Sequence, residues 1–185
     1  MIPNRTGDLR RLFLGLGSNL GDRPRNLAEG LKSLQKKGFV VLRVAPLYDT
    51  EPVGERRQPV FLNTVAEVET AMSSLEVVQA GLLAESAAGR VRGVPGGPRT
   101  LDVDLLLDGD VVMDESEIQV PHPRLHLRRF VLVPLADLAP DLIHPVFRRT
   151  VAQLLASCPD TATVTRASED ASSSALVEFG TGGIS

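Results

Sequence analysis

The sequence is poor in several kinds of residue, and each scarcity excludes a class of protein. Among 185 residues there is one cysteine, Cys158, which excludes an internal disulfide framework and a cysteine-based structural zinc site. Tryptophan is absent, aromatic residues make up 4%, and the net charge is −3, a poor basis for non-specific nucleic-acid binding. We therefore expect a protein of the reducing cytoplasm without a nucleic-acid partner.

Long apolar runs are also lacking. No stretch approaches the roughly 20 continuous apolar residues that a membrane span requires, and the N-terminal residues MIPNRTGDLRR carry no apolar secretory segment. The hydrophobic content of 43% and the length are typical of one globular domain with a real core. We expect no membrane partner, and a single domain over residues 1–159.

Strand and helix patterns alternate along the first two thirds of the chain. Apolar residues predict strands over 12–16, 39–48, 60–70 and 101–107, and helical spacing predicts helices over 22–37 and 73–88. In the second helix we expect Leu75, Val78 and Leu82 to face inward. The order βαββαβ predicts an α+β protein with a ferredoxin-like sandwich, in which the helices cover one face of a sheet.

The C-terminal third differs in composition. Residues 111–156 predict a C-terminal extension with a short strand, a loop and helical segments. Residues 160–185 are rich in Ser, Thr, Gly and Ala, which predicts a mostly disordered tail. Its only apolar docking point would be formed by Leu176, Val177 and Phe179.

Two carboxylates interrupt the apolar strand GPRTLDVDLLL, residues 97–107. Asp102 and Asp104 lie two residues apart and should project from one face, while Leu101, Val103 and Leu105 point into the core. Two such charges repel each other unless a cation lies between them. Carboxylate oxygens without His or Cys suit Mg²⁺, and such a pair can hold two metal ions at a phosphoryl group.

Arginines precede this strand in a glycine-rich loop. Arg90, Arg92 and Arg99 are spaced to surround an anion, and arginines beside metal-binding carboxylates are typical of phosphoryl transfer. An alternative remains open, in which the strand is a wet sheet edge and its aspartates simply pair with Arg92 and Arg99. Glycines at 93, 96 and 97 would permit closure of residues 90–98 over the site.

Other motifs are less specific. GLGSNLG, residues 15–21, is one residue too long for a dinucleotide fingerprint and is typical of a tight strand-to-helix turn. His122 and His126 have a zinc-compatible spacing but Pro123 intervenes, so His122 is either a phosphate donor or a capping residue. Phe61 and Phe130 are typical core residues, although Asn63 beside Phe61 would suit a planar heterocycle.

Five motifs together resemble the 6-hydroxymethyl-7,8-dihydropterin pyrophosphokinase family of folate biosynthesis. They are GLGSNLGDR, YDTEPVG…QPVFLN, GRVR, GPRTLDVDLLL and VPHPRLHLRRFVLVPL, in the family's order over residues 11–145. The resemblance implies transfer of pyrophosphate from ATP to the hydroxymethyl group of a reduced pterin, leaving AMP. It also implies an ATP-dependent diphosphotransferase with two Mg²⁺ ions; the oligomeric state stays open between a monomer and a weak dimer.

The resemblance also implies roles for individual residues. Asp102 and Asp104 match the Mg²⁺ ligands, and Arg90, Arg92 and Arg99 match the basic catalytic residues and ATP contacts. Further ATP contacts are implied for Glu85, Leu105, Gln119, His122 and Arg128. Pterin contacts are implied for Thr50, Val53, Gly54, Phe61, Asn63 and Phe130, with both phenylalanines stacking on the ring.

The sequence departs from some members of the family in places. The loop between Arg92 and Arg99 lacks a tryptophan, Glu51 replaces a proline, and Pro123 replaces a tyrosine. These changes bear on loop closure rather than on the catalytic assignment. The alternatives to an enzyme are a ferredoxin-like nucleic-acid module, for which the aromatic content is low, and a small-molecule-binding module without catalysis.

Overall fold

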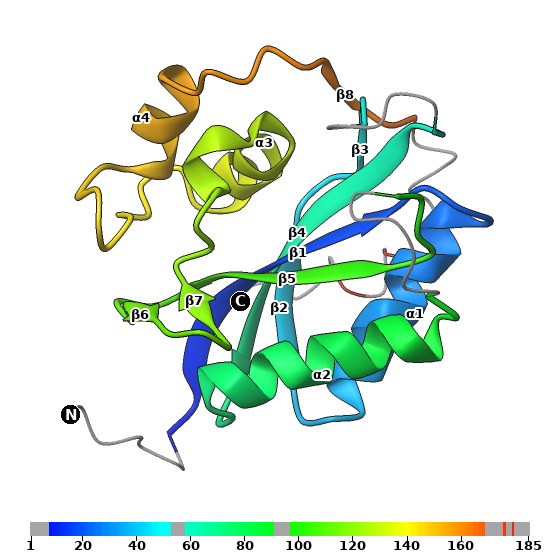
Figure 1. Cartoon of the computed structure of the whole chain (residues 1–185), viewed down its shortest axis with the longest axis horizontal. Coiled ribbons are helices and arrows are strands. Elements are labelled where there is room, and N and C mark those ends of the chain that lie inside the picture. Colours follow the sequence, from blue (N-terminus) through cyan, green and yellow to red (C-terminus); the bar gives the residue numbers. More distant parts are fainter. Residues whose placement is uncertain (1–7, 53–57, 91–96, 169–175, 177–178, 180–185) are drawn as a thin grey trace, which may run out of the picture.

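A six-stranded antiparallel sheet forms the centre of the computed structural model, which describes residues 8–52, 58–90, 97–168, 176 and 179 (Figure 1). The strand order is β5-β1-β4-β3-β8, and β2 pairs with β4 beside β3. The strands are β1 (Arg10–Ser18), β2 (Val40–Val44), β3 (Tyr48–Thr50), β4 (Phe61–Thr70), β5 (Asp102–Asp108) and β8 (Val164–Arg166). A separate two-stranded sheet pairs β6 (Met113–Asp114) with β7 (Gln119–Val120).

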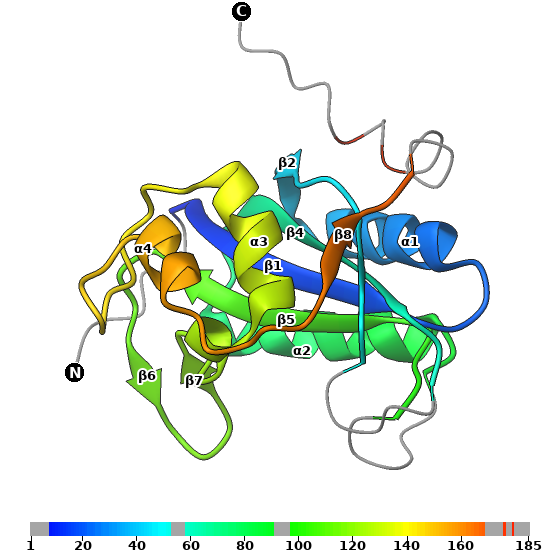
Figure 2. The same ribbon diagram turned by 90° about the horizontal axis from the view of Figure 1, so that it is seen from above.

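Helices cover both faces of the sheet. They are α1 (Arg23–Gln35), α2 (Ser74–Ala87), α3 (Arg129–Leu138) and α4 (Val151–Ala156), with a short 3-10 helix at Leu125–Leu127. Figures 1 and 2 show α1 and α2 on one face and α3 and α4 on the other. The fold is therefore a mixed α/β fold in three layers. Within the described residues, no helix is both long and apolar enough to cross a membrane.

The alternation of β4 divides the interior into two cores. Leu62, Ala66 and Val68 are buried in the larger core, together with the leucines of α1. Val65 faces the opposite way, into the smaller core formed with α3 and α4. The two-residue period of the strand, which the sequence predicts, therefore produces two cores because both faces of the sheet are covered.

Local capping signals set the helix starts. The Asp22 side chain accepts a hydrogen bond from the Arg25 backbone N–H at 3.1 Å, and Pro24 stands in the first turn of α1. Ser73 and Glu76 form a capping box at the start of α2. The predicted positions of both helices are confirmed.

The predicted orientation of α2 is wrong at Leu82, whereas Val78 is partly buried against the larger core as expected. Its buried positions include Val77, Ala80, Gly81 and Ala84, whereas Leu82 is 41% exposed. Small residues on the inner face let the helix approach β5, where a Cβ added at Gly81 would lie 3.3 Å from the Val103 side chain. Close packing of small residues therefore outweighs the burial of leucine here.

Two further predictions need correction. The single strand predicted over 39–48 is divided into β2 and β3 around Pro46, which has no N–H for the ladder and a fixed φ. Residues 164–166, predicted to lie in a disordered tail, form β8 and pair with β3. Their backbone groups extend an existing sheet edge, so they need little apolar surface to be ordered.

Candidate functional site

Asp102 and Asp104 project from the same face of β5 into one cavity. The strand pairs with β1, and Gly17 and Gly15 stand directly opposite Asp102 and Asp104. Because glycine has no side chain, the sheet floor beside both carboxylates stays open. Leu101 and Leu105 are buried in the larger core on the opposite side, so the predicted alternation of this strand is confirmed.

The cavity has a volume of about 490 Å³ and collects side chains from distant parts of the chain. It is lined by Thr50, Glu51, Phe61, Asn63, Arg90, Arg99, Asp102, Asp104, His122, Arg124, Arg128 and Phe130. β3, β4 and β5 supply its floor, the segment after β7 supplies one wall, and the start of α3 supplies Phe130. Carboxylates, guanidinium groups and aromatic rings thus meet in one place.

Asp102 is the centre of an ion-pair network. Its Oδ1 lies 2.6 Å from Arg90 Nη1, and its Oδ2 lies 2.8 Å from Arg99 Nη1. Glu85, buried on α2, accepts from the same Arg90 nitrogen at 2.6 Å and from the Val103 backbone N–H at 2.9 Å. Burial is the main cause that raises the pKa of Glu85. Glu85 does not line the cavity but holds Arg90 against Asp102.

Asp104 has looser contacts. Its Oδ2 lies 3.7 Å from Arg128 Nη1 and 3.9 Å from His122 Nε2. Partial burial in the cavity, and then the charge of Asp102, raise the pKa of Asp104 to about 6. This carboxylate is therefore under-neutralised by the described residues, which is the condition that favours an added cation.

His122 is a neutral donor at neutral pH. Burial, followed by the charges of Arg128 and Arg124, lowers its pKa to about 4. Its Nδ1 accepts from the Arg124 backbone N–H at 3.1 Å, so in the neutral ring the proton is assigned to Nε2. That N–H lies beside Asp104 at the cavity wall, where it can donate to an anion.

The aromatic side of the cavity carries a buried amide. Asn63 donates to Thr50 Oγ1 at 2.6 Å, on the strand face that also carries Phe61. The Arg99 guanidinium carbon lies 5.5 Å from the centre of the Phe61 ring. The Arg128 guanidinium carbon lies 5.6 Å from the centre of the Phe130 ring. Each ring therefore has a cation over one face.

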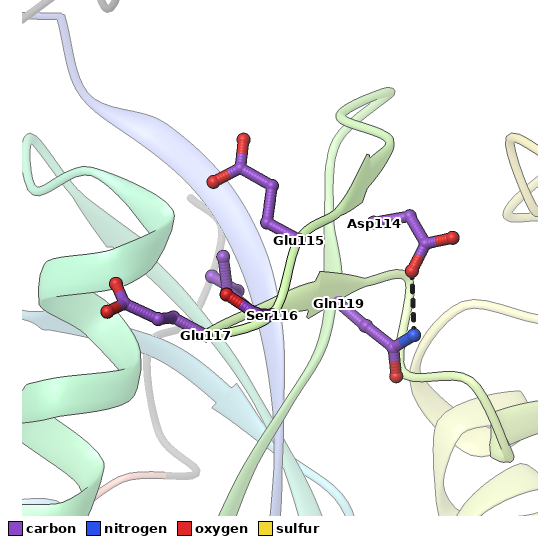
Figure 3. Close-up of a pocket in the computed structure, with 6 residues that line it drawn as sticks. Asp114, Glu115, Ser116, Glu117 and Gln119 are labelled. Atoms are coloured by element: carbon purple, nitrogen blue, oxygen red, sulfur yellow. Dashed lines mark hydrogen bonds between the residues drawn. The ribbon is translucent and has the colours of Figure 1, made fainter.

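Several residues that sequence reasoning selected lie elsewhere. Gln119 on β7 is exposed and donates to Asp114 at 2.7 Å, in a separate shallow acidic pocket (Figure 3). The Leu105 side chain lies in the larger core, not in the cavity. Val53, Gly54 and Arg92 lie outside the described residues, as does most of the loop expected to close.

Sequence reasoning missed other residues of the site. Glu51 and Arg124 line the cavity, and Arg124 could have been found because it follows His122 in a run rich in arginine. Gly17 underlies Asn63, since a Cβ added there would lie 2.5 Å from the Asn63 Oδ1 atom. The GLGSNLG motif includes this glycine, but no local signal shows that it contacts Asn63, because Asn63 belongs to a strand some forty-six residues later.

A divalent cation fits the carboxylate pair on chemical grounds. Asp102 and Asp104 offer oxygen donors on one cavity wall, and Asp104 has no cation closer than 3.7 Å among the described residues. In that part of the chain, no group of three or more His, Cys, Asp or Glu side chains forms a metal site. The pair therefore suits an ion such as Mg²⁺, which takes one or two carboxylates and completes its shell with phosphate and water.

Comparison with known proteins gives consistent results over most of the chain. A 2-amino-4-hydroxy-6-hydroxymethyldihydropteridine pyrophosphokinase of Pseudomonas aeruginosa is 40% identical over 152 residues, covering 82% of this chain and 93% of the relative. A protein of the same name from Bacillus subtilis is 39% identical, covering 68% and 76%. The folic acid synthesis protein fol1 of Schizosaccharomyces pombe is 39% identical, covering 80% of this chain but 20% of the relative.

Solved structures share the fold at low sequence identity. Wild-type Plasmodium falciparum HPPK-DHPS matches with a TM-score of 0.62 and 13% identity, covering 80% of this chain and 44% of that chain. This chain thus spans less than half of that protein and a fifth of fol1. The family model for 7,8-dihydro-6-hydroxymethylpterin-pyrophosphokinase (HPPK) matches residues 13–140, which include both aspartates, the arginines and both phenylalanines of the cavity. The chain belongs to the HPPK family.

Proposed function

We propose that this protein transfers diphosphate from ATP to the hydroxymethyl group of 6-hydroxymethyl-7,8-dihydropterin, in folate biosynthesis. The products are AMP and the pterin diphosphate. The observation that carries the proposal is the cavity itself, where a carboxylate pair and arginines meet two aromatic rings and a buried amide. The carboxylates and arginines suit a metal-bound triphosphate, and the aromatic rings and the amide suit a flat heterocycle with hydrogen-bonding edges. Membership in the family supports the same pyrophosphokinase reaction.

In the proposed reaction, the pterin hydroxyl oxygen attacks the β-phosphorus of ATP in line. The bond between this phosphorus and the oxygen bridging to the α-phosphorus breaks, and AMP leaves with the electron pair. The hydroxyl proton passes to solvent, and we assign no side chain as a dedicated base. Catalysis then comes from positioning and charge neutralisation, with Arg90, Arg99 and Arg128 facing the phosphates and His122 donating through Nε2.

Asp102 and Asp104 are the proposed ligands for two Mg²⁺ ions. When bound, the ions would neutralise the triphosphate and orient its β-phosphorus. Glu85 contributes indirectly, because it shares Arg90 with Asp102 and fixes the position of that guanidinium. Roles for Arg92, Leu105 and Gln119 at the ATP site stay predictions that rest on the family resemblance.

The heterocycle is proposed to stack between Phe61 and Phe130, with its edge on Asn63. Thr50 already accepts the Asn63 amide N–H, so the Asn63 carboxamide is held in one orientation. For the substrate to stack on ring faces now covered by Arg99 and Arg128, those guanidinium groups must turn toward the phosphates. Val53 and Gly54 stay predicted pterin contacts.

The finer description of the fold is also part of the proposal. The order β5-β1-β4 followed by β2 and β3, with α1 and α2 on one face, supports a ferredoxin-like core with a C-terminal extension. We place the protein in the cytoplasm, as a monomer or weak dimer without nucleic-acid or membrane partners. The net charge of −3 and the single cysteine support this placement.

AMP release from ATP tests the proposed function directly. Purified protein is incubated with ATP, with and without 6-hydroxymethyl-7,8-dihydropterin and Mg²⁺. AMP should accumulate only when all components are present, together with an equal amount of pterin diphosphate. The proposal fails if AMP forms at the same rate without the pterin, or if ATP is converted to ADP.

A further inference from the structure

Asn19 joins the two sides of the cavity without lining it. The residue follows β1 in the GLGSNLG turn and is 2% exposed. Figures 1 and 2 show this turn at the end of the sheet where β4 and β5 begin. A tight turn requires glycine and a capping residue, but it does not require a buried carboxamide. The function described above leaves this residue without a role.

The contacts of Asn19 reach two distant segments. Its Oδ1 accepts from the Arg99 backbone N–H at 2.7 Å, and its own backbone N–H donates to the Arg99 carbonyl at 3.0 Å. Its Nδ2 donates to Gln58 Oε1 and to the Pro59 carbonyl, both at 3.1 Å. Asn19 thus binds both the N–H and the carbonyl of the Arg99 main chain. The Asn19 side chain also binds Gln58 and Pro59, which precede Phe61 in the chain.

The segments that Asn19 joins carry groups from opposite sides of the site. Arg99 reaches Asp102 at 2.8 Å and lies over the Phe61 ring. Because the Arg99 backbone is fixed by Asn19, the guanidinium can turn between the ring and the phosphates without its Cα moving. A displaced backbone would instead shift the charge away from the phosphates.

We infer that Asn19 is a positioning residue for phosphoryl transfer, acting through Arg99. It sets the distance between Arg99 and the start of β4, and therefore between the triphosphate and the heterocycle stacked on Phe61. The inference rests on the proposed function. A misplacement of about 1 Å at a reacting centre can lower the rate about 10²-fold, so a residue outside the cavity can have a large effect.

Asn26 provides a matched control. Its Nδ2 donates to Ser18 Oγ at 3.2 Å and to the Leu20 carbonyl at 2.8 Å, so it holds the same turn. Neither acceptor lies in the segments that carry Pro59 or Arg99. Asn26→Ala should therefore weaken the turn and lower Tm, as Asn19→Ala should, but without moving Arg99.

The test is a double-mutant cycle between Asn19 and Arg99, with kcat and KM for AMP release measured well below Tm. We expect Asn19→Ala to lower kcat by about 10-fold to 10²-fold with a smaller change in KM, and Asn26→Ala to lower it by less than about threefold. In an Arg99→Ala background, Asn19→Ala should change kcat by less than about threefold. Additive losses, or equal losses for Asn19→Ala and Asn26→Ala, would overturn the inference.

Two further arms keep the test decisive. If Asn19→Ala does not yield folded protein, Asn19→Ser replaces it, because the shorter side chain cannot reach both Arg99 and Pro59. The same cycle is run on the Kd of ATP with Mg²⁺ by calorimetry. If the wild type binds ATP but makes no AMP with the pterin, the proposed function fails. Coupling between Asn19 and Arg99 in Kd then supports the positioning role, and its absence overturns it.

Discussion

Asp102 and Asp104 share a strand face but have different surroundings. Asp102 is held between Arg90 and Arg99 at 2.6 and 2.8 Å, whereas the nearest guanidinium to Asp104 is 3.7 Å away and the imidazole at 3.9 Å is neutral. Removing a carboxylate that is paired leaves its partners unneutralised, while removing one that is loosely paired leaves little unsatisfied. The two residues should therefore respond differently to the same substitution.

Asp104→Asn should abolish most activity without loss of stability. We expect AMP release to fall about 10²-fold to 10³-fold, the range for loss of one electrostatic group in an active site. The Tm without metal should be unchanged or slightly higher, since a carboxylate beside Asp102 is removed. Asp102→Asn should lower both the activity and the Tm. Activity of Asp104→Asn near the wild-type rate would exclude the proposed metal role.

Gly17 and Gly15 provide a second pair of residues with different surroundings. A Cβ at Gly17 would lie 2.5 Å from Asn63 Oδ1, whereas one at Gly15 would lie 3.4 Å from the Leu106 side chain. Gly17→Ala should therefore displace the Asn63 carboxamide and raise KM for the pterin at least about tenfold, the order of one lost hydrogen bond. Gly15→Ala should leave this KM near the wild-type value. Equal KM values in both variants would contradict the assignment of Asn63.

At the scale of elements, α3 covers the sheet face that carries the site. Its N-terminal part supplies Phe130 to the cavity, while Val131, Leu132 and Leu135 fill the smaller core. The connection from α3 to α4 contains His144, which is 3% exposed. Its Nδ1 accepts from the backbone N–H groups of Val146 and Phe147 at 3.3 and 3.4 Å. This connection therefore depends on a neutral imidazole.

Stability should fall as pH falls below about 6.5, the ordinary pKa of histidine. Burial, and then the neighbouring His126, lower the pKa of His144 in the folded protein. The unfolded chain therefore binds the proton more readily than the folded protein does. The contribution of His144 to the unfolding free energy is then complete above about pH 6.5 and is lost on acidification. His144→Asn, whose Oδ1 can accept the same bonds, should reduce the slope of unfolding free energy between pH 7 and 5. An unchanged slope would assign the effect to other groups, such as His122.

For the molecule as a whole, the C-terminal region completes the sheet. β8 pairs with β3, the strand that ends in Thr50, and the Ala167 backbone N–H donates to the Leu47 carbonyl at 2.8 Å. Asp160 accepts from the Arg129 backbone N–H at 2.9 Å, at the start of α3. Leu176 and Phe179 are buried in the larger core. The described residues beyond 159 thus contact the start of α3, the strand β3 that lines the site, or the larger core.

Two truncations separate these contributions. Deletion of 169–185 removes Leu176 and Phe179 and should cost a few kcal/mol, at about 1.5–3 kcal/mol for each buried side chain. Deletion of 160–185 also removes β8 and the Asp160 contact, so it should lower the unfolding free energy further and raise KM for the pterin through Thr50. Urea unfolding of both truncated proteins checks the order. Equal stability would show that β8 contributes nothing.

The sequence alone predicted β1, β4 and β5, the starts of α1 and α2, and the aspartate pair, because these depend on neighbouring residues. Alternation along β5 requires only its own two-residue period, and the capping of α1 and α2 requires only residues within one turn. The inward face of α2, the division around Pro46 and the pairing of β8 depend on partners far along the chain. Local sequence patterns do not show which distant segments pack together, so these features were missed or misplaced.

The site shows the same division. The sequence determined that Asp102 and Asp104 face one way and that arginines precede them, and the family resemblance supplied the proposed roles of Asn63 and the phenylalanines. Only the tertiary structure decided that Gly17 leaves room for Asn63, that Gln119 bonds Asp114 instead, and that Asn19 holds Arg99 to Pro59. Strand order and register set these contacts. They are fixed by packing over the whole sheet, which no short stretch of sequence specifies.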